Sequence, residues 1–300
     1  MNSMERLNKC PLCKSGLFLN LREVKDHSIS KETFLLCQCS KCQLIFTNPR
    51  PDKESIHEYY QSQDYISHQD KSNNLTNFIY KNVRRITIKQ KINWLNQFNK
   101  LKGNLLDIGC GTGYFLKAAK KSQWSVRGIE PDKTARKLAK KKKLKVEAEI
   151  SEVYKKDHYH CITLFHVLEH VHELRKTGKQ LVRMLKSQGI LMIAVPNYDS
   201  FDAKYYEEKW AGLDVPRHLY HFTQNTMEYF ANEMNLDIEA KIPMKFDSYY
   251  VSLLSEKYKN ENSSLFQQYK NGLLNGFQSN RWARKNEGNY SSILFILKKK

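Results

Sequence analysis

The chain has 300 residues, seven of them cysteine, and a formal net charge of +19 at pH 7. This length suits one sizeable α/β domain with appendages and exceeds what a single small module needs. Met1–Arg22 lacks the apolar run of a signal peptide, and the longest apolar runs, such as Ile190–Val195, have only strand length. We therefore expect a cytoplasmic protein with no transmembrane segment.

The positive charge favours polyanionic partners such as nucleic acid or an acidic membrane surface. The excess is spread along the chain as lysine, with one dense run at Arg136–Lys145. Such a distribution is typical of a solvated surface, so we treat it as a weak indication of a polyanion partner.

Two C-x-x-C pairs lie near the N-terminus and are separated by a strand-rich interval. This arrangement predicts a tetrahedral structural zinc site, to which we assign no chemistry because four thiolates leave no position for water. The predicted ligands are Cys10, Cys13, Cys39 and Cys42. Cys37 is an alternative ligand, since the interval is longer than in a usual zinc ribbon. The two prolines of Asn48–Pro51 mark the end of the unit, so we expect a zinc-ribbon-like module over 1–50.

Three further regions follow this module. Segment 51–100 has apolar residues at loosely helical spacing and predicts a helical preface. Within 101–245, short apolar runs alternate with amphipathic stretches, which is the order of βαβ units. Segment 246–300 is expected to complete the sheet with strands and a helix, including a strand at Ile293–Leu297.

The alternating region predicts the fold class. The expected strands are Leu105–Ile108, Val126–Ile129, Cys161–Phe165 and Ile190–Val195. The expected helices are Tyr114–Ser122, Lys133–Lys143, Glu173–Leu185 and Thr223–Asn235. We therefore predict an α/β fold with a Rossmann-like, doubly wound, mostly parallel sheet and helices on both faces.

A glycine-rich loop, Gly109-Cys-Gly-Thr-Gly, joins the first strand of this region to a helix. Its glycines let the backbone approach a ligand without interference from a Cβ. Because residue 114 is tyrosine, the spacing disfavours the NAD fingerprint. Glu130 ends the second strand, where its carboxylate suits the two hydroxyls of a ribose. Alternatively, the glycines only form a tight turn and Glu130 caps the next helix.

The loop and its strand, Leu-Asp-Ile-Gly-Cys-Gly-Thr-Gly, resemble the first motif of the class I S-adenosylmethionine-dependent methyltransferases. The resemblance covers roughly residues 75–240. It implies that the glycine turn lies against the methionine part of the cofactor, that Glu130 binds the ribose and that Asp107 lies near the ammonium group. The cofactor-binding residues inferred in this way are Asp107, Gly109, Cys110, Gly111, Gly113, Tyr114, Glu130, Pro131, Phe165 and His166.

His166-Val-Leu-Glu169-His170 follows the Cys161–Phe165 strand directly, and ligands of open α/β sheets bind at such strand ends. The letters also spell the H-x-x-E-H motif of zinc peptidases, but that motif requires a continuous helix. We therefore treat the match as a coincidence. The family resemblance assigns a Glu-His pair here to the cofactor or substrate side. His170 is a candidate base because imidazole titrates near neutrality; alternatively, it only hydrogen-bonds a neighbouring loop.

Segment 196–222 follows the Ile190–Val195 strand, and its second half is dense in Trp, Asp, Arg and His. We therefore predict that it is the substrate loop. The candidates for substrate recognition or proton removal are Asp214, Arg217, His218 and His221. With His170, we take Asp214, His218 and His221 as the predicted catalytic set. Alternatively, Asp214 and Arg217 form an ion pair and the histidines are structural. Asp247 and its neighbours add polar groups whose position the sequence does not fix.

Some sugar methyltransferases also carry an N-terminal zinc module, and this architecture resembles theirs. The sequence thus predicts an S-adenosylmethionine-dependent methyltransferase acting on a small molecule, a sugar or a glycan precursor. The absence of an Asn-Pro-Pro-Tyr motif disfavours methylation of base amino groups. The alternative is a zinc-ribbon RNA-binding protein or RNA methyltransferase whose lysines contact phosphate.

Overall fold

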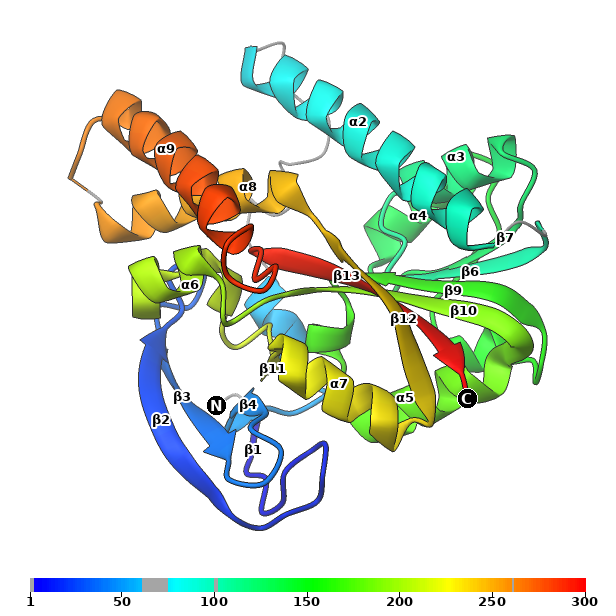
Figure 1. Cartoon of the computed structure of the whole chain (residues 1–300), viewed down its shortest axis with the longest axis horizontal. Helices are drawn as coiled ribbons and strands as arrows, with labels where there is room; N and C mark the ends of the chain where they lie inside the picture. The colour runs from blue at the N-terminus through cyan, green and yellow to red at the C-terminus, as the bar shows by residue number, and fades with distance from the viewer. Residues whose placement is uncertain (1–2, 61–74, 100–101, 261) are drawn as a thin grey trace.

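The computed structural model describes residues 3–60, 75–99, 102–260 and 262–300. Its centre is a seven-stranded sheet with the order β12-β13-β10-β9-β6-β7-β8 (Figure 1). The strands from β10 to β8 pair in parallel, whereas β13 pairs antiparallel with both β10 and β12. The strands are β6 (Asn104–Ile108), β7 (Ser125–Ile129), β8 (Val146–Glu147), β9 (Tyr159–Phe165), β10 (Leu185–Pro196), β12 (Leu236–Pro243) and β13 (Ser292–Lys299).

Helices cover both faces of this sheet (Figure 1). One buried cluster joins α2, α3 and α4 to the sheet, and a second joins α5 and α7 to the opposite face. Their bounds are α2 (Leu75–Phe98), α3 (Tyr114–Lys121), α4 (Lys133–Lys141), α5 (Leu174–Met184) and α7 (Gln224–Glu233). Because both faces are covered, β9 and the second half of β10, Ile190–Val195, are mostly apolar and buried. The predicted Rossmann-like α/β fold is confirmed.

The chain order of the parallel strands creates a switch point between β6 and β9. From β6 the chain proceeds through β7 to β8 at one edge, and it then returns to place β9 and β10 on the other side of β6. Loops that leave the carboxyl ends of neighbouring strands diverge at such a point and leave a crevice for a ligand. The glycine loop, Glu130 and His166 all lie at these carboxyl ends.

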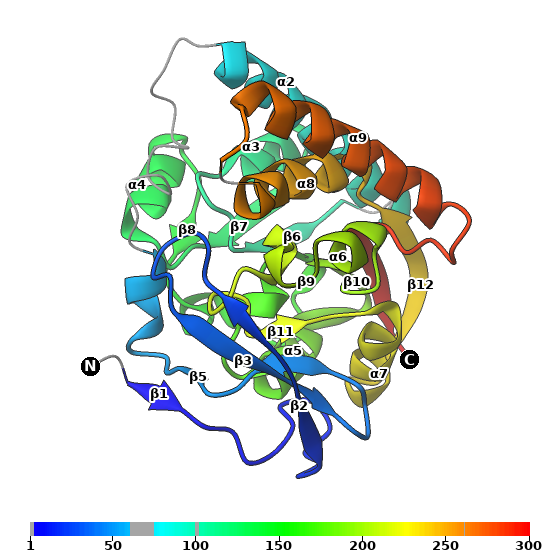
Figure 2. The same ribbon diagram turned by 90° about the vertical axis from the view of Figure 1, so that its left-hand side faces the viewer.

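The N-terminal module shares a sheet with the predicted substrate loop (Figure 2). Its four-stranded sheet has the order β11-β4-β3-β2, and β11 comes from the loop that follows β10. The bounds are β1 (Met4–Glu5), β2 (Phe18–Lys25), β3 (Thr33–Cys39), β4 (Ile45–Thr47), β5 (Arg50–Pro51) and β11 (Tyr220–His221). A buried cluster also joins Leu36 and Ile45 of the module to Trp210 and Leu213 of the loop. The module and the loop therefore form one packed unit.

The C-terminal region differs from the expectation of strands and a helix. The structure has two helices, α8 (Lys245–Lys259) and α9 (Leu265–Ala283), before the single strand β13. The two helices approach closely at glycines: a Cβ at Gly272 would lie 2.8 Å from the backbone of Leu253, and a Cβ at Gly276 would lie 2.8 Å from that of Tyr249. The two helices thus pack closely through glycines. An apolar repeat, which is the usual sequence signal for a helix, is not what brings them together.

The remaining elements are short. They are α6 (Phe201–Tyr206) and the 3-10 helices η1 (Ile56–Tyr60), η2 (Ile150–Val153), η3 (Leu168–His170), η4 (Glu207–Lys209) and η5 (Ala211–Leu213). Residues 61–74 of the predicted helical preface lie outside the described residues. Within the described ranges, no helix is long and apolar enough to cross a membrane.

Candidate active site

The three glycines of the loop after β6 all have left-handed backbones, with φ of 67°, 53° and 80° at Gly109, Gly111 and Gly113. Their surroundings differ. A Cβ at Gly109 would lie 2.4 Å from Val167 Cγ2, and one at Gly113 would lie 2.5 Å from Leu144 Cδ1. A Cβ at Gly111 would meet no protein atom within 4 Å. The expectation that all three glycines make room for a ligand is therefore corrected: only Gly111 faces open space, and the other two make room for protein side chains.

Glu130 connects the glycine loop to the end of β7. The backbone N–H of Gly111 donates to Glu130 Oε2 at 2.7 Å, and that of Asp132 donates to Oε1 at 2.9 Å. Burial raises the pKa of the Glu130 carboxyl, and these backbone hydrogen bonds oppose the rise. The cap of α4 is Asp132, which accepts from the Ala135 N–H at 2.6 Å. Glu130 therefore holds the loop in place, and the alternative that it caps α4 is wrong.

Asp107 provides a second buried carboxylate at the end of β6. Only 3% of the residue is exposed, and the Thr163 hydroxyl of β9 donates to its Oδ1 at 2.7 Å. Burial raises the pKa of Asp107 to about 7, although the Thr163 hydrogen bond and the nearby charge of Lys91 oppose the rise. The Lys91 ammonium itself lies 3.8 Å from the centre of the Phe165 ring. Asp107 is thus close to the balance between its neutral and ionised forms at physiological pH.

Three other predicted cofactor residues border the same loop. Cys110 is buried, and its thiol packs against the backbone of Gly128 in β7. Tyr114 begins α3, and its ring lies beneath the cations of Arg84 and Lys142, at 3.9 and 4.6 Å from the ring centre. Pro131 is exposed beyond Glu130. These positions surround the open space at the glycine loop.

His166 follows β9 with a left-handed φ of 58°, a conformation that a non-glycine residue adopts at an energetic cost. Its Nε2 lies 2.9 Å from Asp247 Oδ2, and its Nδ1 lies 3.5 Å from Glu169 Oε1. Burial alone would lower the pKa of His166, but the hydrogen bond with Asp247 and the nearby Glu169 carboxylate raise it to about 9. His166 is therefore a cation between two carboxylates.

His170 and His218 come together although they lie on different elements. Their ring centroids are 4.6 Å apart. His170 Nδ1 lies 2.9 Å from the Arg217 carbonyl oxygen and 3.0 Å from the Tyr60 hydroxyl, and His218 Nδ1 lies 2.9 Å from the Gly212 carbonyl oxygen. Because a carbonyl only accepts hydrogen bonds, each Nδ1 carries a proton, which leaves each Nε2 for another partner. Burial, and then the proximity of His218, lowers the pKa of His170 to about 4.

The other predicted loop residues point in different directions. Arg217 is buried and donates to Asp26 at 2.8 Å and to Asp214 at 2.7 Å, which is the ion-pair alternative considered for this loop. Asp214 Oδ2 also lies 4.0 Å from His218 Nε2. His221 is buried, with its pKa lowered to about 3 by burial, and its Nε2 has no hydrogen-bond partner among the described residues. The loop thus places His218 beside His170 and turns Arg217 toward the N-terminal module.

The comparison with known proteins assigns the family. Residues 80–241, more than half of the chain, match a family described as a methyltransferase domain. The chain belongs to the class I S-adenosylmethionine-dependent methyltransferases. The resemblance seen in the sequence is therefore confirmed.

Several relatives and structures are similar to this methyltransferase. An uncharacterized protein of Methanocaldococcus jannaschii is 32% identical over 111 residues, covering 36% of this chain and 52% of that protein. A ubiquinone biosynthesis O-methyltransferase of Pelagibacter ubique is 35% identical over 100 residues, covering 31% and 42%. The matches thus span about half of these relatives or less.

Magnesium protoporphyrin IX methyltransferase from Synechocystis with bound S-adenosylhomocysteine has a similar structure. It superposes with a TM-score of 0.54 at 14% identity, covering 83% of this chain and all of that one. At this level of identity, the likeness shows the fold alone.

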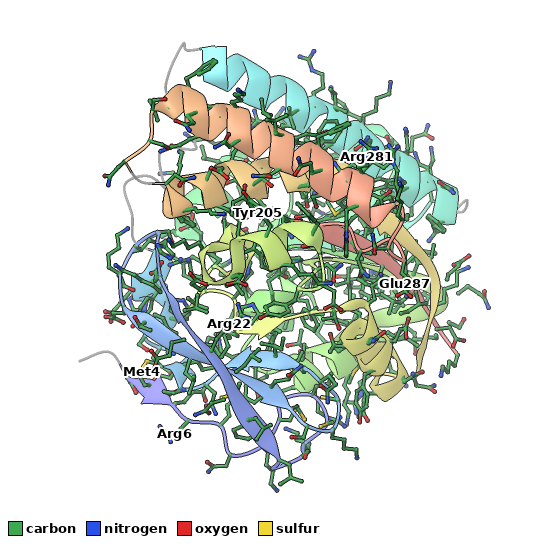
Figure 3. All side chains as sticks on the ribbon, turned by 60° about the vertical axis from the view of Figure 1, so that its left-hand side comes forward. Met4, Arg6, Arg22, Tyr205, Arg281 and Glu287 are labelled. Atoms are coloured by element: carbon green, nitrogen blue, oxygen red, sulfur yellow. The ribbon has the colours of Figure 1, made fainter. Side chains whose placement is uncertain are left out.

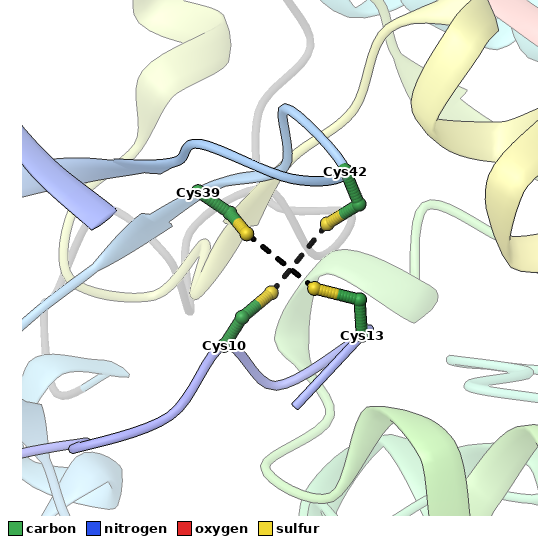
Figure 4. A group of neighbouring side chains, drawn as sticks. All are labelled: Cys10, Cys13, Cys39 and Cys42. Carbon is green, nitrogen blue, oxygen red and sulfur yellow. Dashed lines mark hydrogen bonds between the residues drawn. The ribbon is translucent and has the colours of Figure 1, made fainter. Parts of the chain in front are cut away.

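The four predicted cysteine ligands of the methyltransferase meet in the N-terminal module (Figure 4). Their sulfurs all lie within 4.8 Å of one another, with Cys10 and Cys42 at 3.5 Å and Cys13 and Cys39 at 3.4 Å. A tetrahedral zinc ion with Zn–S bonds of about 2.3 Å separates its sulfurs by roughly 3.8 Å, so the four thiols fit it. Cys37 is apart from this group, with its sulfur 3.6 Å from Asn20 Oδ1.

The two cysteine pairs have the same local geometry. The N–H of Lys14 donates to the Cys10 carbonyl at 3.0 Å, and that of Gln43 donates to the Cys39 carbonyl at 3.0 Å. Lys14 and Gln43 also share a left-handed φ, of 65° and 61°. The two knuckles are therefore matched turns, each presenting its thiols to the same point.

Sequence reasoning missed three site residues that distant elements supply. Lys91 comes from α2, Tyr60 from η1 and Thr163 from the middle of β9. A polar residue inside an otherwise apolar strand was the available signal for Thr163. Lys91 and Tyr60 lie in helical or polar segments where lysine and tyrosine are common, so no local pattern marks them as site residues.

Proposed function

We propose that this chain transfers the methyl group of S-adenosylmethionine to a small molecule, such as a sugar or a glycan precursor. The observation that carries the proposal is the open space at Gly111, in a loop that Glu130 holds and that follows the strand carrying Asp107. A carboxylate oxygen accepts more than one hydrogen bond, so Glu130 can bind ribose hydroxyls while it holds the loop. An ionised Asp107 suits the ammonium group of the cofactor.

The bound cofactor would supply an electrophilic methyl group on a sulfonium. The chain's own residues would orient the acceptor in line with it, and such positioning lowers much of the barrier to transfer. We propose that the cluster of His170, His218 and Asp214 faces the acceptor, because each of its imidazoles has Nε2 left for another partner. His221 adds a further unpartnered ring nitrogen. An imidazole nitrogen in this position can remove a proton from the acceptor or bind a cation.

We further propose that the four-cysteine cluster holds a structural zinc ion. The donor set is four thiols in a nearly tetrahedral group, and all seven cysteines of the chain are free. Zinc would connect the two knuckles of a module that has little core of its own. Arg175 of α5 donates to the Leu12 carbonyl in the first knuckle at 2.6 Å, so the module docks on the cofactor domain. Free thiols suit a reducing, cytoplasmic location.

An RNA substrate is the alternative. Figure 3 labels Arg6 and Arg22 in the N-terminal module and Arg281 on α9, so basic side chains occur on separate parts of the molecule. Phosphate-driven binding loses affinity steeply as salt rises. RNA binding that collapses between low and moderate salt would therefore favour the alternative.

Calorimetric titration of the zinc-loaded protein with S-adenosylmethionine, and separately with NAD, tests the proposal. We expect binding of S-adenosylmethionine alone, lost in Glu130→Gln. Glu147→Gln is a matched control, because Glu147 lies on the neighbouring strand and pairs only at the surface, with Lys140 at 3.6 Å. A folded protein that does not bind S-adenosylmethionine would refute the proposed function.

A further inference from the structure

A second cluster of metal-binding groups lies outside the cysteine module. A carboxylate oxygen of Glu169 and one ring nitrogen each of His170 and His218 lie within 4.8 Å of one another. Glu169 and His170 end the short helix η3, and His218 comes from the loop that precedes β11. Three side chains that can bind a metal ion thus converge at one point.

Glu169 has one cationic neighbour, His166, but no hydrogen-bond donor for its carboxylate among the described residues. The residue is fully buried, and neither carboxylate oxygen has a hydrogen-bond partner among the described residues. The nearest cationic group is His166, whose Nδ1 lies 3.5 Å from Oε1 and whose Nε2 is engaged with Asp247. A buried carboxylate without hydrogen bonds is strongly unfavourable, so a buried orphan of this kind indicates a missing ligand.

The two histidines are oriented as metal ligands are. In metal sites, the ring nitrogen that does not bind the metal usually donates to a carbonyl or a carboxylate, which fixes the tautomer. Here, Nδ1 of His170 is held by the Arg217 carbonyl and Nδ1 of His218 by the Gly212 carbonyl, each at 2.9 Å. With Nδ1 of both rings engaged by a carbonyl, Nε2 is the nitrogen that each ring has left for a cation.

We propose that Glu169, His170 and His218 bind a divalent first-row transition metal ion. Two imidazoles and one carboxylate suit ions such as Zn²⁺, Fe²⁺, Mn²⁺ or Co²⁺, and three protein ligands leave positions open for water or substrate. The site differs from the H-x-x-E-H peptidase arrangement because His166 turns to Asp247 and the third ligand comes from the loop.

The role of this ion rests on the proposed methyl transfer, whereas the site itself rests on geometry alone. The site follows the carboxyl end of β9, at the edge of the sheet that also carries the glycine loop. His170 and His218 would then be ligands rather than bases. A bound ion with an open position would supply Lewis-acid activation of an acceptor hydroxyl.

The test measures metal binding directly, with Co²⁺ as the probe and the cysteine cluster already loaded with zinc. Equilibrium dialysis followed by elemental analysis should show one cobalt per chain in addition to one zinc. The visible spectrum should show ligand-field bands without the intense thiolate charge-transfer bands of a cysteine site. Glu169→Gln and His218→Gln should each lose the cobalt and keep the zinc.

His172→Gln is the matched control, because His172 lies near the cluster in sequence but its Nε2 faces the Pro51 carbonyl at 3.1 Å. It should keep both metals. Cobalt should also raise the melting temperature of the wild type and of His172→Gln, and leave that of Glu169→Gln unchanged. The variants are compared by near-ultraviolet circular dichroism, and His170→Gln replaces any variant that does not fold.

A wild type that binds only the zinc, or a Glu169→Gln variant that keeps its cobalt, would overturn the proposal. The metal-binding measurements use no S-adenosylmethionine, so the metal site and the proposed methyl transfer can each be refuted without the other. A protein that binds Co²⁺ at this site but does not bind S-adenosylmethionine refutes the proposed function and retains the metal site. A protein that binds S-adenosylmethionine and no second metal gives the reverse result.

Discussion

Arg217 is predicted to be a stability residue that joins the loop to the N-terminal module. Its guanidinium donates to Asp26 at 2.8 Å and to the Tyr59 carbonyl at 2.9 Å, and the Asp26 side chain is fully buried. Arg217→Leu would leave the Asp26 carboxylate buried without its cation, although donors from Ser28 and Ser30 would remain. Breaking a buried pair in this way costs about 3–5 kcal/mol, which lowers the melting temperature by on the order of 10 °C.

The effect should depend on pH. Burial opposes ionisation of Asp26, but the hydrogen bonds from Arg217 hold the pKa of that carboxyl below its usual value. A lowered folded-state pKa contributes stability above the unfolded value of about 3.9, and this contribution is lost as pH falls further. The loss of unfolding free energy caused by Arg217→Leu should therefore have its full value at pH 7. It should shrink in acid, where Asp26 becomes protonated in the variant.

Urea unfolding of the wild type, Arg217→Leu, Asp26→Asn and the double variant measures this coupling. We expect the double variant to be more stable than the sum of the single changes predicts, by about 2 kcal/mol or more. Affinity for S-adenosylmethionine should not change, because Asp107 and Glu130 belong to other elements. Additive effects, or a variant of normal stability that loses only substrate turnover, would refute this reasoning and make Arg217 a substrate residue.

Three further predictions concern the cofactor loop and the zinc cluster. Burial raises the folded-state pKa of Asp107 to about 7, above its unfolded value, so its ionisation costs stability increasingly as pH rises to about 7. Asp107→Asn should therefore melt higher than the wild type at pH 8 without cofactor, yet bind S-adenosylmethionine more weakly; a lower melting temperature would contradict this. Gly111→Ala should cost about 1–2 kcal/mol for its left-handed φ and block the cofactor, whereas Gly113→Ala should cost more in urea unfolding because its Cβ would overlap Leu144. Elemental analysis should show that Cys39→Ser loses zinc and Cys37→Ser keeps it; the opposite result would exchange their roles.

The parts of the fold that could be predicted have local signals in the sequence. The strands β6, β7, β9 and β10 are apolar runs, and both their existence and their parallel order follow from the alternation with amphipathic helices. The glycine loop and Glu130 follow directly from strand ends. Carboxyl ends of neighbouring parallel strands meet at one edge of the sheet, so adjacency in space could be inferred without the structure.

The parts that could not be predicted depend on contacts between distant segments. Asp247, which pairs with His166, lies in the first turn of α8, 81 residues further along the chain, and β11 joins a sheet built by the first 47 residues. Glycine is unfavourable inside a helix, but the glycines of α9 allow α8 to approach. Arg217 is a similar case, because a buried ion pair and a substrate-binding arginine have the same local sequence.

The histidine-rich segment 166–170 shows that a sequence motif can predict the wrong metal ligands when the backbone geometry is not known. Read as H-x-x-E-H, it would place two histidine ligands on one helix, but the left-handed turn at His166 directs that residue away toward Asp247. The 3-10 turn that follows then buries Glu169 and leaves its carboxylate without a donor. The position is completed by His218, whose loop is held in place by its own strand in the N-terminal sheet and by the Arg217 ion pair. The N-terminal module therefore contributes to the proposed metal site indirectly, because it holds the loop that carries His218.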